Sequence, residues 1–115
     1  MGLAACGTEA TPAPGGPGDS VVTIAAVGIA FEGGDIRVPA ELAFTIRLDN
    51  RDDGIPHGLA IMGGPGMATE VVVSTIVEGP AEVDLEVATG LVAGAYQLIC
   101  PVHPVTMVTD LTVGP

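Results

Sequence analysis

From Ser20 onward the chain alternates apolar and polar residues with a period of two, and turn residues interrupt the alternation every few positions. A period of two places successive side chains on opposite faces of a β-strand, so the pattern predicts strands with one buried face. The clearest case is the segment 42–49, whose apolar positions are Leu42, Phe44, Ile46 and Leu48. Seventeen glycines and ten prolines supply turns. We predict an all-β sandwich of roughly seven or eight strands.

Size and composition narrow the possibilities further. A chain of 115 residues corresponds to a single domain. Aromatic residues make up only 3% and Trp is absent, so we expect a core of Val, Ile, Leu and Ala. No segment approaches the ~20 uninterrupted apolar residues of a membrane-spanning helix. The net charge of −11 disfavours nucleic acid and anionic lipid as partners. It fits either a basic protein partner or a surface that is acidic for solubility alone.

Several individual elements can be predicted from the same pattern. We expect a first strand over 21–27 and a kinked strand over 29–38 that is broken at Gly33-Gly34. The β-branched run at 71–77 predicts a further strand. The only place that allows a helical turn is 67–70.

Side chains able to bind a metal recur at strand ends in this pattern. His57 begins an inward-facing strand, Cys100 ends another, Met107 opens a third, and His103 lies on the loop between the last two. Such a loop can wrap three side chains around one point, which His57 reaches from a neighbouring strand. One thiolate, two imidazoles and a weak axial thioether are the donors of an electron-transfer copper centre. Both histidines of the chain fall in this set.

Each of these residues also has a simpler interpretation. Cys100 could be an inert buried thiol, and Met107 could be a core packing residue. His57 could be a core histidine with a hydrogen-bond partner, but its sequence neighbours offer none: Ile55, Pro56, Leu59 and Ile61. Zinc would accept the same donors, although structural zinc sites usually carry more thiolates. The combination of a lone Cys with a Met favours copper.

Two segments resemble the copper-binding segments of the cupredoxin family, plastocyanin, amicyanin and halocyanin in particular. They are Ile55-Pro-His57-Gly-Leu-Ala-Ile61 and Gly94-Ala-Tyr-Gln-Leu-Ile-Cys100-Pro-Val-His103-Pro-Val-Thr-Met107. The resemblance implies a Greek-key β-sandwich with one type 1 (blue) copper ion at one end. His57, Cys100 and His103 would be its in-plane ligands and Met107 its axial ligand. The family commonly has Asn after the first ligand histidine, whereas this chain has Gly58.

The resemblance also implies a function. The protein would carry one electron on copper and transform no substrate, so it would not be an enzyme. Electrons would pass through the exposed edge of His103 to a redox protein, either a cytochrome or a copper oxidoreductase. The apolar residues expected at the docking surface are Ile55, Pro56, Pro104 and Val105. We expect a monomer.

Three other functions compete with electron transfer. A copper trafficking or storage protein would use surface clusters of Met or Cys, whereas these ligands are predicted to be internal. A catalytic copper enzyme would need further histidines for a second metal. A β-sandwich without metal is the third alternative.

The first nineteen residues have a different character. The segment Leu3-Ala4-Ala5-Cys6-Gly7 resembles the lipobox of bacterial and archaeal lipoproteins, whose Cys becomes the lipidated mature N-terminus. Residues 7–19 are rich in Thr, Pro, Ala and Gly without apolar periodicity, as a flexible tether would be. A disulfide between Cys6 and Cys100 is disfavoured because it would remove the thiolate from the metal-binding set.

We therefore predict three parts along the chain. Residues 1–5 would be the remnant of a lipoprotein signal peptide, 6–19 a Pro/Gly-rich tether, and 20–115 the cupredoxin domain. The protein would lie outside the cytoplasm, in the periplasm or on the outer face of the cell membrane. Its only attachment to the membrane would be a lipid anchor on Cys6.

Overall fold

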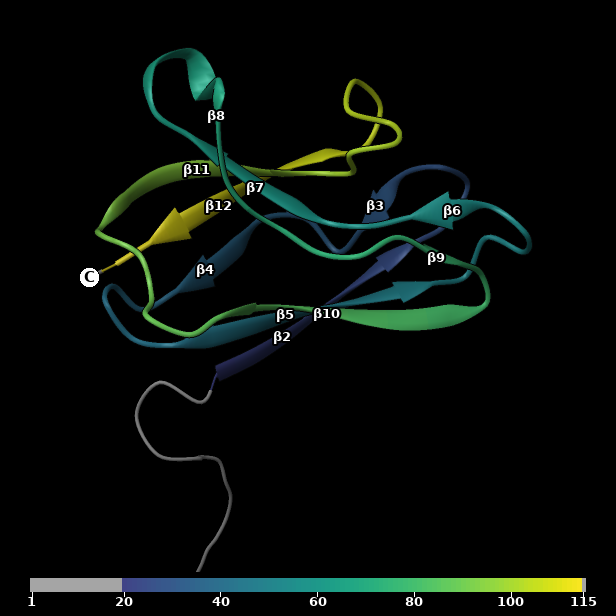
Figure 1. Ribbon diagram of the computed structural model, residues 1–115, viewed down its shortest axis with the longest axis horizontal. Coiled ribbons are helices and arrows are strands. Elements are labelled where there is room, and N and C mark those ends of the chain that lie inside the picture. Colours follow the sequence, from purple (N-terminus) through teal and green to yellow (C-terminus); the bar gives the residue numbers. More distant parts are fainter. Residues whose placement is uncertain (1–19, 115) are drawn as a thin grey trace, which may run out of the picture.

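A computed structural model describes residues 20–114, and the predicted signal remnant, the tether and Cys6 lie outside these residues. Two β-sheets pack face to face (Figure 1). The first sheet has the order β10-β5-β2-β3. Its strands are β2 (Ser20–Ala26), β3 (Phe31–Glu32), β5 (Phe44–Asn50) and β10 (Ala81–Val87).

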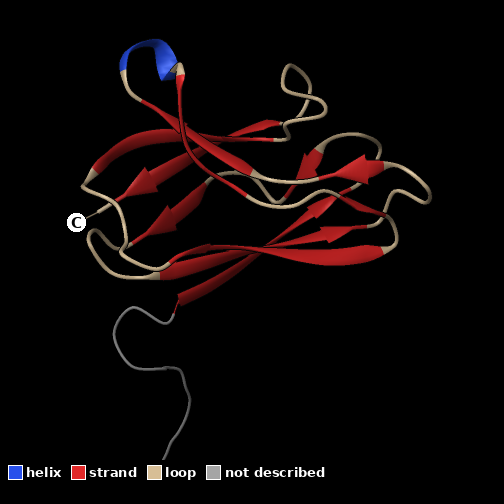
Figure 2. Cartoon of the chain, viewed as in Figure 1, coloured by secondary structure: helices blue, strands red, loops and turns tan. Residues whose placement is uncertain are grey.

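The second sheet has the order β4-β12-β11-β7-β8. Its strands are β4 (Ile36–Val38), β7 (Ala60–Gly63), β8 (Thr69–Val73), β11 (Gly94–Ile99) and β12 (Val108–Val113). A short ladder joins β6 (Pro56–His57) to β9 (Val77–Glu78). The single helical element among residues 20–114 is the 3-10 turn η1 (Pro65–Met67), blue in Figure 2.

The predicted all-β Greek-key sandwich is confirmed. Within residues 20–114, eight strands have three or more residues, in agreement with the predicted number, and three two-residue strands bring the total to eleven. No helix in this part of the chain is long and apolar enough to cross a membrane.

Alternation of side chains explains how the two sheets pack. Along β5, buried and half-buried residues alternate without exception, and Ile46 and Leu48 have no exposed surface. In the paired strand β10, Leu85 lies opposite Ile46 and is also buried. Full burial of such a side chain contributes about 1.5–3 kcal/mol. The inward faces of both sheets therefore form one aliphatic core, which also contains Cys100.

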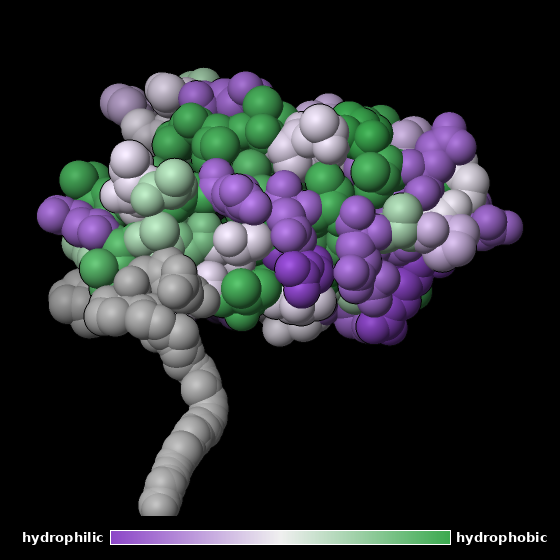
Figure 3. Space-filling view, turned by 60° about the horizontal axis from the view of Figure 1, so that its bottom comes forward, coloured by the Kyte–Doolittle hydropathy of each residue, from purple (hydrophilic) through white to green (hydrophobic). Residues whose placement is uncertain are grey.

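The outer face of the four-stranded sheet is polar. The molecule is turned in Figure 3 so that this face comes forward, and hydrophilic side chains (purple) cover much of it. Arg47 on β5 and Asp84 on β10 point outward there and form an ion pair, with 2.8 Å between Nε and Oδ1. The alternation predicted for residues 42–49 therefore separates core from solvent as expected, except that Leu42 is 38% exposed.

Two predicted strands are wrong in detail. Residues 29–38 do not form one kinked strand. β3 pairs with β2 in the first sheet, whereas β4 pairs with β12 in the second. Gly33 (φ 124°) and Gly34 (φ 81°) adopt backbone conformations that other residues rarely reach, and they carry the chain from one sheet to the other.

The run 71–77 is also not a single strand. β8 ends at Val73, and residues 74–76 form a loop before β9. Only part of the run reaches the core: Val72 packs against it, whereas Val71 and Val73 on the edge strand β8 are 41% and 45% exposed. The predicted helical turn at 67–70 is displaced by two residues, to η1.

Candidate metal centre

Three donors of the predicted set meet at one end of the sandwich. Sγ of Cys100 lies 3.8 Å from Nδ1 of His57 and 3.8 Å from Nδ1 of His103. One ligand atom from each of the three residues lies within 4.8 Å of the others. The two imidazole rings meet edge to face, with centroids 5.0 Å apart. Both Nδ1 atoms therefore face the same sulfur.

The spacing suits a single metal ion held between the donors. A metal about 2.3 Å from sulfur and about 2.0 Å from nitrogen keeps these atoms roughly 3.6 Å apart when the bonds diverge by trigonal or tetrahedral angles. The observed distances of 3.8 Å agree with this separation. One sulfur and two imidazole nitrogens suit either copper or zinc.

The loop after β11 positions Cys100 and His103. Cys100 follows the last residue of β11, and three backbone hydrogen bonds close the loop. The N–H of His103 donates to the carbonyl of Cys100, and the N–H of Met107 donates to that of His103. The N–H of Cys100 donates in turn to the carbonyl of Met107, at 3.0 Å. These hydrogen bonds hold the end of β11 beside the start of β12.

Met107 lies just before β12, as predicted. Its side chain has no exposed surface and belongs to the same core cluster as Cys100. His103 is partly exposed, whereas Cys100 and His57 are fully buried. Of the four candidate ligands, His103 alone reaches solvent.

Comparison with solved structures identifies the fold. Auracyanin A, a "blue" copper protein from the green thermophilic photosynthetic bacterium Chloroflexus aurantiacus, is 22% identical. The alignment covers 84% of this chain and 100% of that chain, with a TM-score of 0.74. The chain has the cupredoxin fold.

Two further structures agree with this cupredoxin fold. Auracyanin from the photosynthetic bacterium Roseiflexus castenholzii is 17% identical, with 84% of this chain and 98% of that chain covered and a TM-score of 0.70. A reduced variant of amicyanin is 20% identical, with 83% of each chain covered and a TM-score of 0.59. Comparisons with protein-family models and with curated protein sequences find no match.

Within this cupredoxin fold, His57 has a partner that the sequence analysis missed. Its Nε2 lies 2.8 Å from Oδ2 of Asp52. A carboxylate accepts hydrogen bonds and does not donate them, so in the neutral imidazole Nε2 carries the proton and Nδ1 has its lone pair toward Cys100. The partner is not one of the neighbours considered in the sequence but Asp52, five positions earlier, and it leaves Nδ1 of His57 free to bind a metal.

Asp52 itself is held by backbone donors from a distant turn. The N–H of Gly28 donates to Oδ1 at 2.7 Å, and the N–H of Ile29 donates to Oδ2 at 2.8 Å. The hydrogen bond from His57 is the main cause that lowers the pKa of Asp52, and those from Ile29 and Gly28 add to it against partial burial. The carboxyl group is therefore ionised at neutral pH.

A second buried polar residue, Asn50, braces the same loop. Its side-chain amide donates to the carbonyls of Ile55 and Val77, at 2.8 and 2.9 Å. Its Oδ1 accepts from the N–H of Asp52 at 3.0 Å. Both the nitrogen and the oxygen of the buried Asn50 amide therefore have hydrogen-bond partners, as a buried amide requires.

Gly58 is required by a close approach of backbone. A Cβ at this position would lie 2.9 Å from the carbonyl oxygen of Thr75 and 2.5 Å from Cδ1 of Ile76. The Asn that cupredoxins commonly carry here would not fit. Ser74 links the loop between β8 and β9 to the segment after His57, because its hydroxyl accepts a hydrogen bond from the N–H of Leu59 at 2.9 Å.

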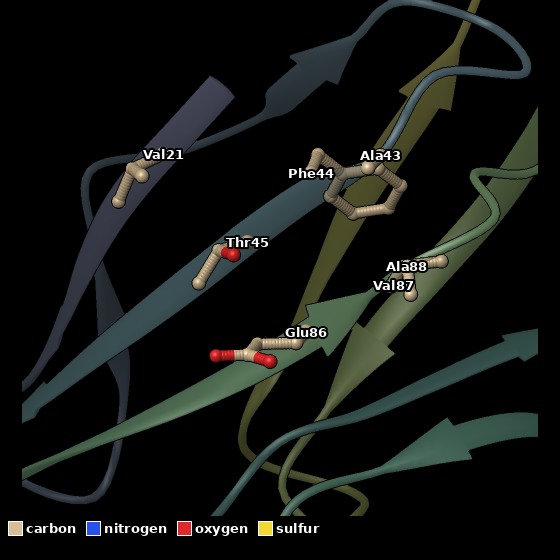
Figure 4. Close-up of a pocket in the computed structure, with 7 residues that line it drawn as sticks. All are labelled: Val21, Ala43, Phe44, Thr45, Glu86, Val87 and Ala88. Carbon is tan, nitrogen blue, oxygen red and sulfur yellow. The ribbon is translucent and has the colours of Figure 1, made fainter. Parts of the chain in front are cut away.

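An open pocket lies at the opposite end of the cupredoxin sandwich, between β2, β5 and the end of β10 (Figure 4). Its lining residues are Val21, Ala43, Phe44, Thr45, Glu86, Val87 and Ala88. Among these, Glu86 is the only charged side chain, so the pocket has no group of metal ligands.

Proposed function

We propose that the protein carries single electrons on one type 1 copper ion. The observation that carries the proposal is the spacing of one buried sulfur and two imidazole nitrogens, at 3.8 Å, in a cupredoxin fold. His57, Cys100 and His103 would be the in-plane ligands and Met107 the weak axial ligand. When bound, the copper supplies a one-electron couple between Cu(II) and Cu(I).

The surrounding residues favour electron transfer over catalysis. His57, Cys100 and Met107 have no exposed surface, so the chain leaves no room for a substrate on their side of the site. The backbone bonds between Cys100, His103 and Met107 hold these ligands in one arrangement. A site that changes little between oxidation states exchanges electrons readily. We therefore propose a carrier and not an enzyme.

Electrons would enter and leave beside His103, the partly exposed ligand. Val102 and Val105 on the same loop are 43% and 87% exposed, which gives this end of the molecule an apolar surface. The net charge of −11 makes the molecule as a whole acidic. These properties suit a transient redox partner, a cytochrome or a copper oxidoreductase, with an apolar contact surface and basic residues around it.

The location of the protein is also part of the proposal. The lipobox-like segment around Cys6 supports a lipid anchor and a site outside the cytoplasm. We propose that the domain acts there as a monomer, tethered through residues 6–19.

Addition of Cu(II) to metal-free protein tests the proposed function. We expect one copper per chain and an intense visible band from thiolate-to-copper charge transfer, reversibly bleached by a reductant. Cys100→Ser should abolish the band because it removes the sulfur donor. Cys6→Ser is the matched control and should keep it. Tight, colourless Cu(I) binding without a visible Cu(II) band would instead indicate a trafficking or storage protein.

Met107→Leu tests the axial position. The colour should remain, because the three in-plane donors are intact, and the reduction potential should change. Met62→Leu on β7 is the control for loss of a thioether and should leave the potential unchanged. Complete loss of copper binding in Met107→Leu would show that Met107 is not a weak axial ligand.

A further inference from the structure

Hydrogen bonds link His57 through Asp52 to the β2–β3 turn of the four-stranded sheet. His57 Nε2 contacts Asp52, and Asp52 accepts from the N–H groups of Gly28 and Ile29 in the β2–β3 turn. The Asp52 side chain is only 10% exposed and that of His57 is fully buried. A carboxylate with so little water around it interacts strongly with the imidazole that it contacts.

The turn is shaped to receive this carboxylate. Gly28 and Ile29 both have positive φ, 65° and 57°, as the two-residue hairpin loop of type I′ requires. For Ile, a β-branched residue, this conformation is costly. Strained residues of this kind persist where the surroundings determine their conformation, and they concentrate at functional sites. Here the conformation directs two adjacent N–H groups onto one carboxylate.

Asp52 is fixed from its backbone side as well. Asn50 accepts from its N–H, and Asn50 is itself bonded to the carbonyls of Ile55 and Val77. The carboxylate therefore cannot turn away from His57 without breaking its bonds to Gly28 and Ile29, and Asn50 holds the backbone that carries it. Asp53, the next residue, is exposed, and no hydrogen bond from its side chain is present in the described part of the chain.

We propose that Asp52 is the positioning residue of the copper site: it holds His57 with Nδ1 directed at the metal position, and its negative charge lowers the reduction potential. The proposed effect on the reduction potential depends on the function proposed above, whereas the proposed orientation of His57 does not depend on it. Carboxylate partners of ligand histidines fix the tautomer and make the ligand a stronger donor. Reduction takes one electron from the partner protein and removes one positive charge from the ion, so a nearby anion favours the oxidised form.

The first test uses metal-free protein. Nitrogen-15 NMR of the imidazole rings distinguishes the two neutral tautomers of His57. We expect the Nε2–H tautomer in the unmodified protein, with a slowly exchanging ring proton, and a shift toward the Nδ1–H tautomer in Asp52→Ala. The Nδ1–H tautomer in the unmodified protein would overturn the proposal, whether or not the protein binds copper.

The second test compares Asp52→Asn with Asp53→Asn in copper-loaded protein. The two substitutions remove the same charge at adjacent positions, but only the first contacts His57. Loss of such a partner typically changes metal affinity 10- to 100-fold. If Asp52→Asn weakens the binding of Cu(II) by this factor and leaves that of Cu(I) unchanged, it raises the reduction potential by about 60–120 mV, at 59 mV per tenfold change in affinity. Asp53→Asn should shift the potential by less than half as much. Equal shifts would overturn the proposal.

The two tests separate the possible failures. A protein with the expected tautomer but no visible copper band would refute the proposed function and leave the orienting role of Asp52 intact. A blue protein whose potential does not respond to Asp52→Asn would retain the function and refute the charge effect.

Discussion

Ile29 adopts a backbone conformation that a β-branched side chain rarely occupies. Its φ of 57° lies in the left-handed region, which costs an L-residue roughly 1–2 kcal/mol. Its side chain is 36% exposed, so burial of that side chain returns little of this cost. The functional contact is made by its N–H, which does not depend on the side chain.

Replacement of Ile29 by Asn should therefore stabilise the protein. Asn tolerates the left-handed region and keeps the N–H that Asp52 accepts. We expect the free energy of unfolding of the metal-free protein to rise by about 1 kcal/mol in urea denaturation. Val27→Asn is the control, because Val27 is 40% exposed and has an ordinary φ. A loss of stability in Ile29→Asn equal to that of the control would contradict the interpretation.

Single residues also show where sequence reasoning stops. His57, Cys100 and His103 could be found because their types are rare in this chain and their positions match strand ends. The structure brings these three together, although their role as ligands stays a prediction. Asp52 could not be found, because its partners in the β2–β3 turn lie more than twenty residues earlier in the chain.

Strands β5 and β10 carry a cross-strand ion pair on their outer face. Arg47 and Asp84 are directly paired in the register. Two hydrogen bonds join them, at 2.8 and 3.2 Å. Because the two side chains are 40% and 34% exposed, solvent screens the interaction. Exposed pairs of this kind contribute little to stability.

The stabilisation by this pair should depend on pH. The hydrogen bond from Arg47 is the main cause that lowers the pKa of Asp84. A carboxyl whose folded-state pKa is depressed stabilises the fold above its unfolded pKa, and the effect is lost as pH falls through the folded value. Asp84→Asn should therefore be less stable than the unmodified protein at pH 7, and the difference should shrink below pH 3.8, the ordinary value.

Denaturation of both proteins across this pH range provides the measurement. Glu86→Gln is a suitable control, since Glu86 lies on the same strand opposite Thr45 and not opposite a cation. If the difference between Asp84→Asn and the unmodified protein were constant down to acidic pH, the ion pair would not be its cause.

Element prediction succeeded wherever a strand has one buried face. β5, β11 and β12 keep the predicted alternation because their inward side chains enter one core. The period of two does not show to which sheet a strand belongs, so the transfer of the chain between sheets at Gly33-Gly34 was missed. An apolar edge strand such as β8 likewise cannot be distinguished by pattern from a buried strand.

The molecule as a whole carries a large excess of negative charge. The chain has fourteen acidic residues and three basic ones. Like charges on a compact molecule repel each other and destabilise it, and dissolved salt screens this repulsion. We expect the thermal unfolding midpoint of the metal-free protein to rise between about 0.01 M and 0.1 M sodium chloride, over which the Debye length falls from about 30 to 10 Å. A fall in the midpoint would show that attractive surface pairs outweigh the net charge.

The direction of β2 has a consequence for any surface to which the protein is attached. β2 runs from Ser20 toward the β2–β3 turn (Figure 1). In that turn Gly28 donates to Asp52, which contacts His57 of the candidate metal centre. Seven strand residues cover about 20 Å, so Ser20 lies near the pocket end of the sandwich. In a molecule immobilised through the chain ahead of Ser20, on an electrode or a vesicle, the attachment would lie at the end of the domain opposite His103. The exposed edge of His103 would then be available to soluble partners.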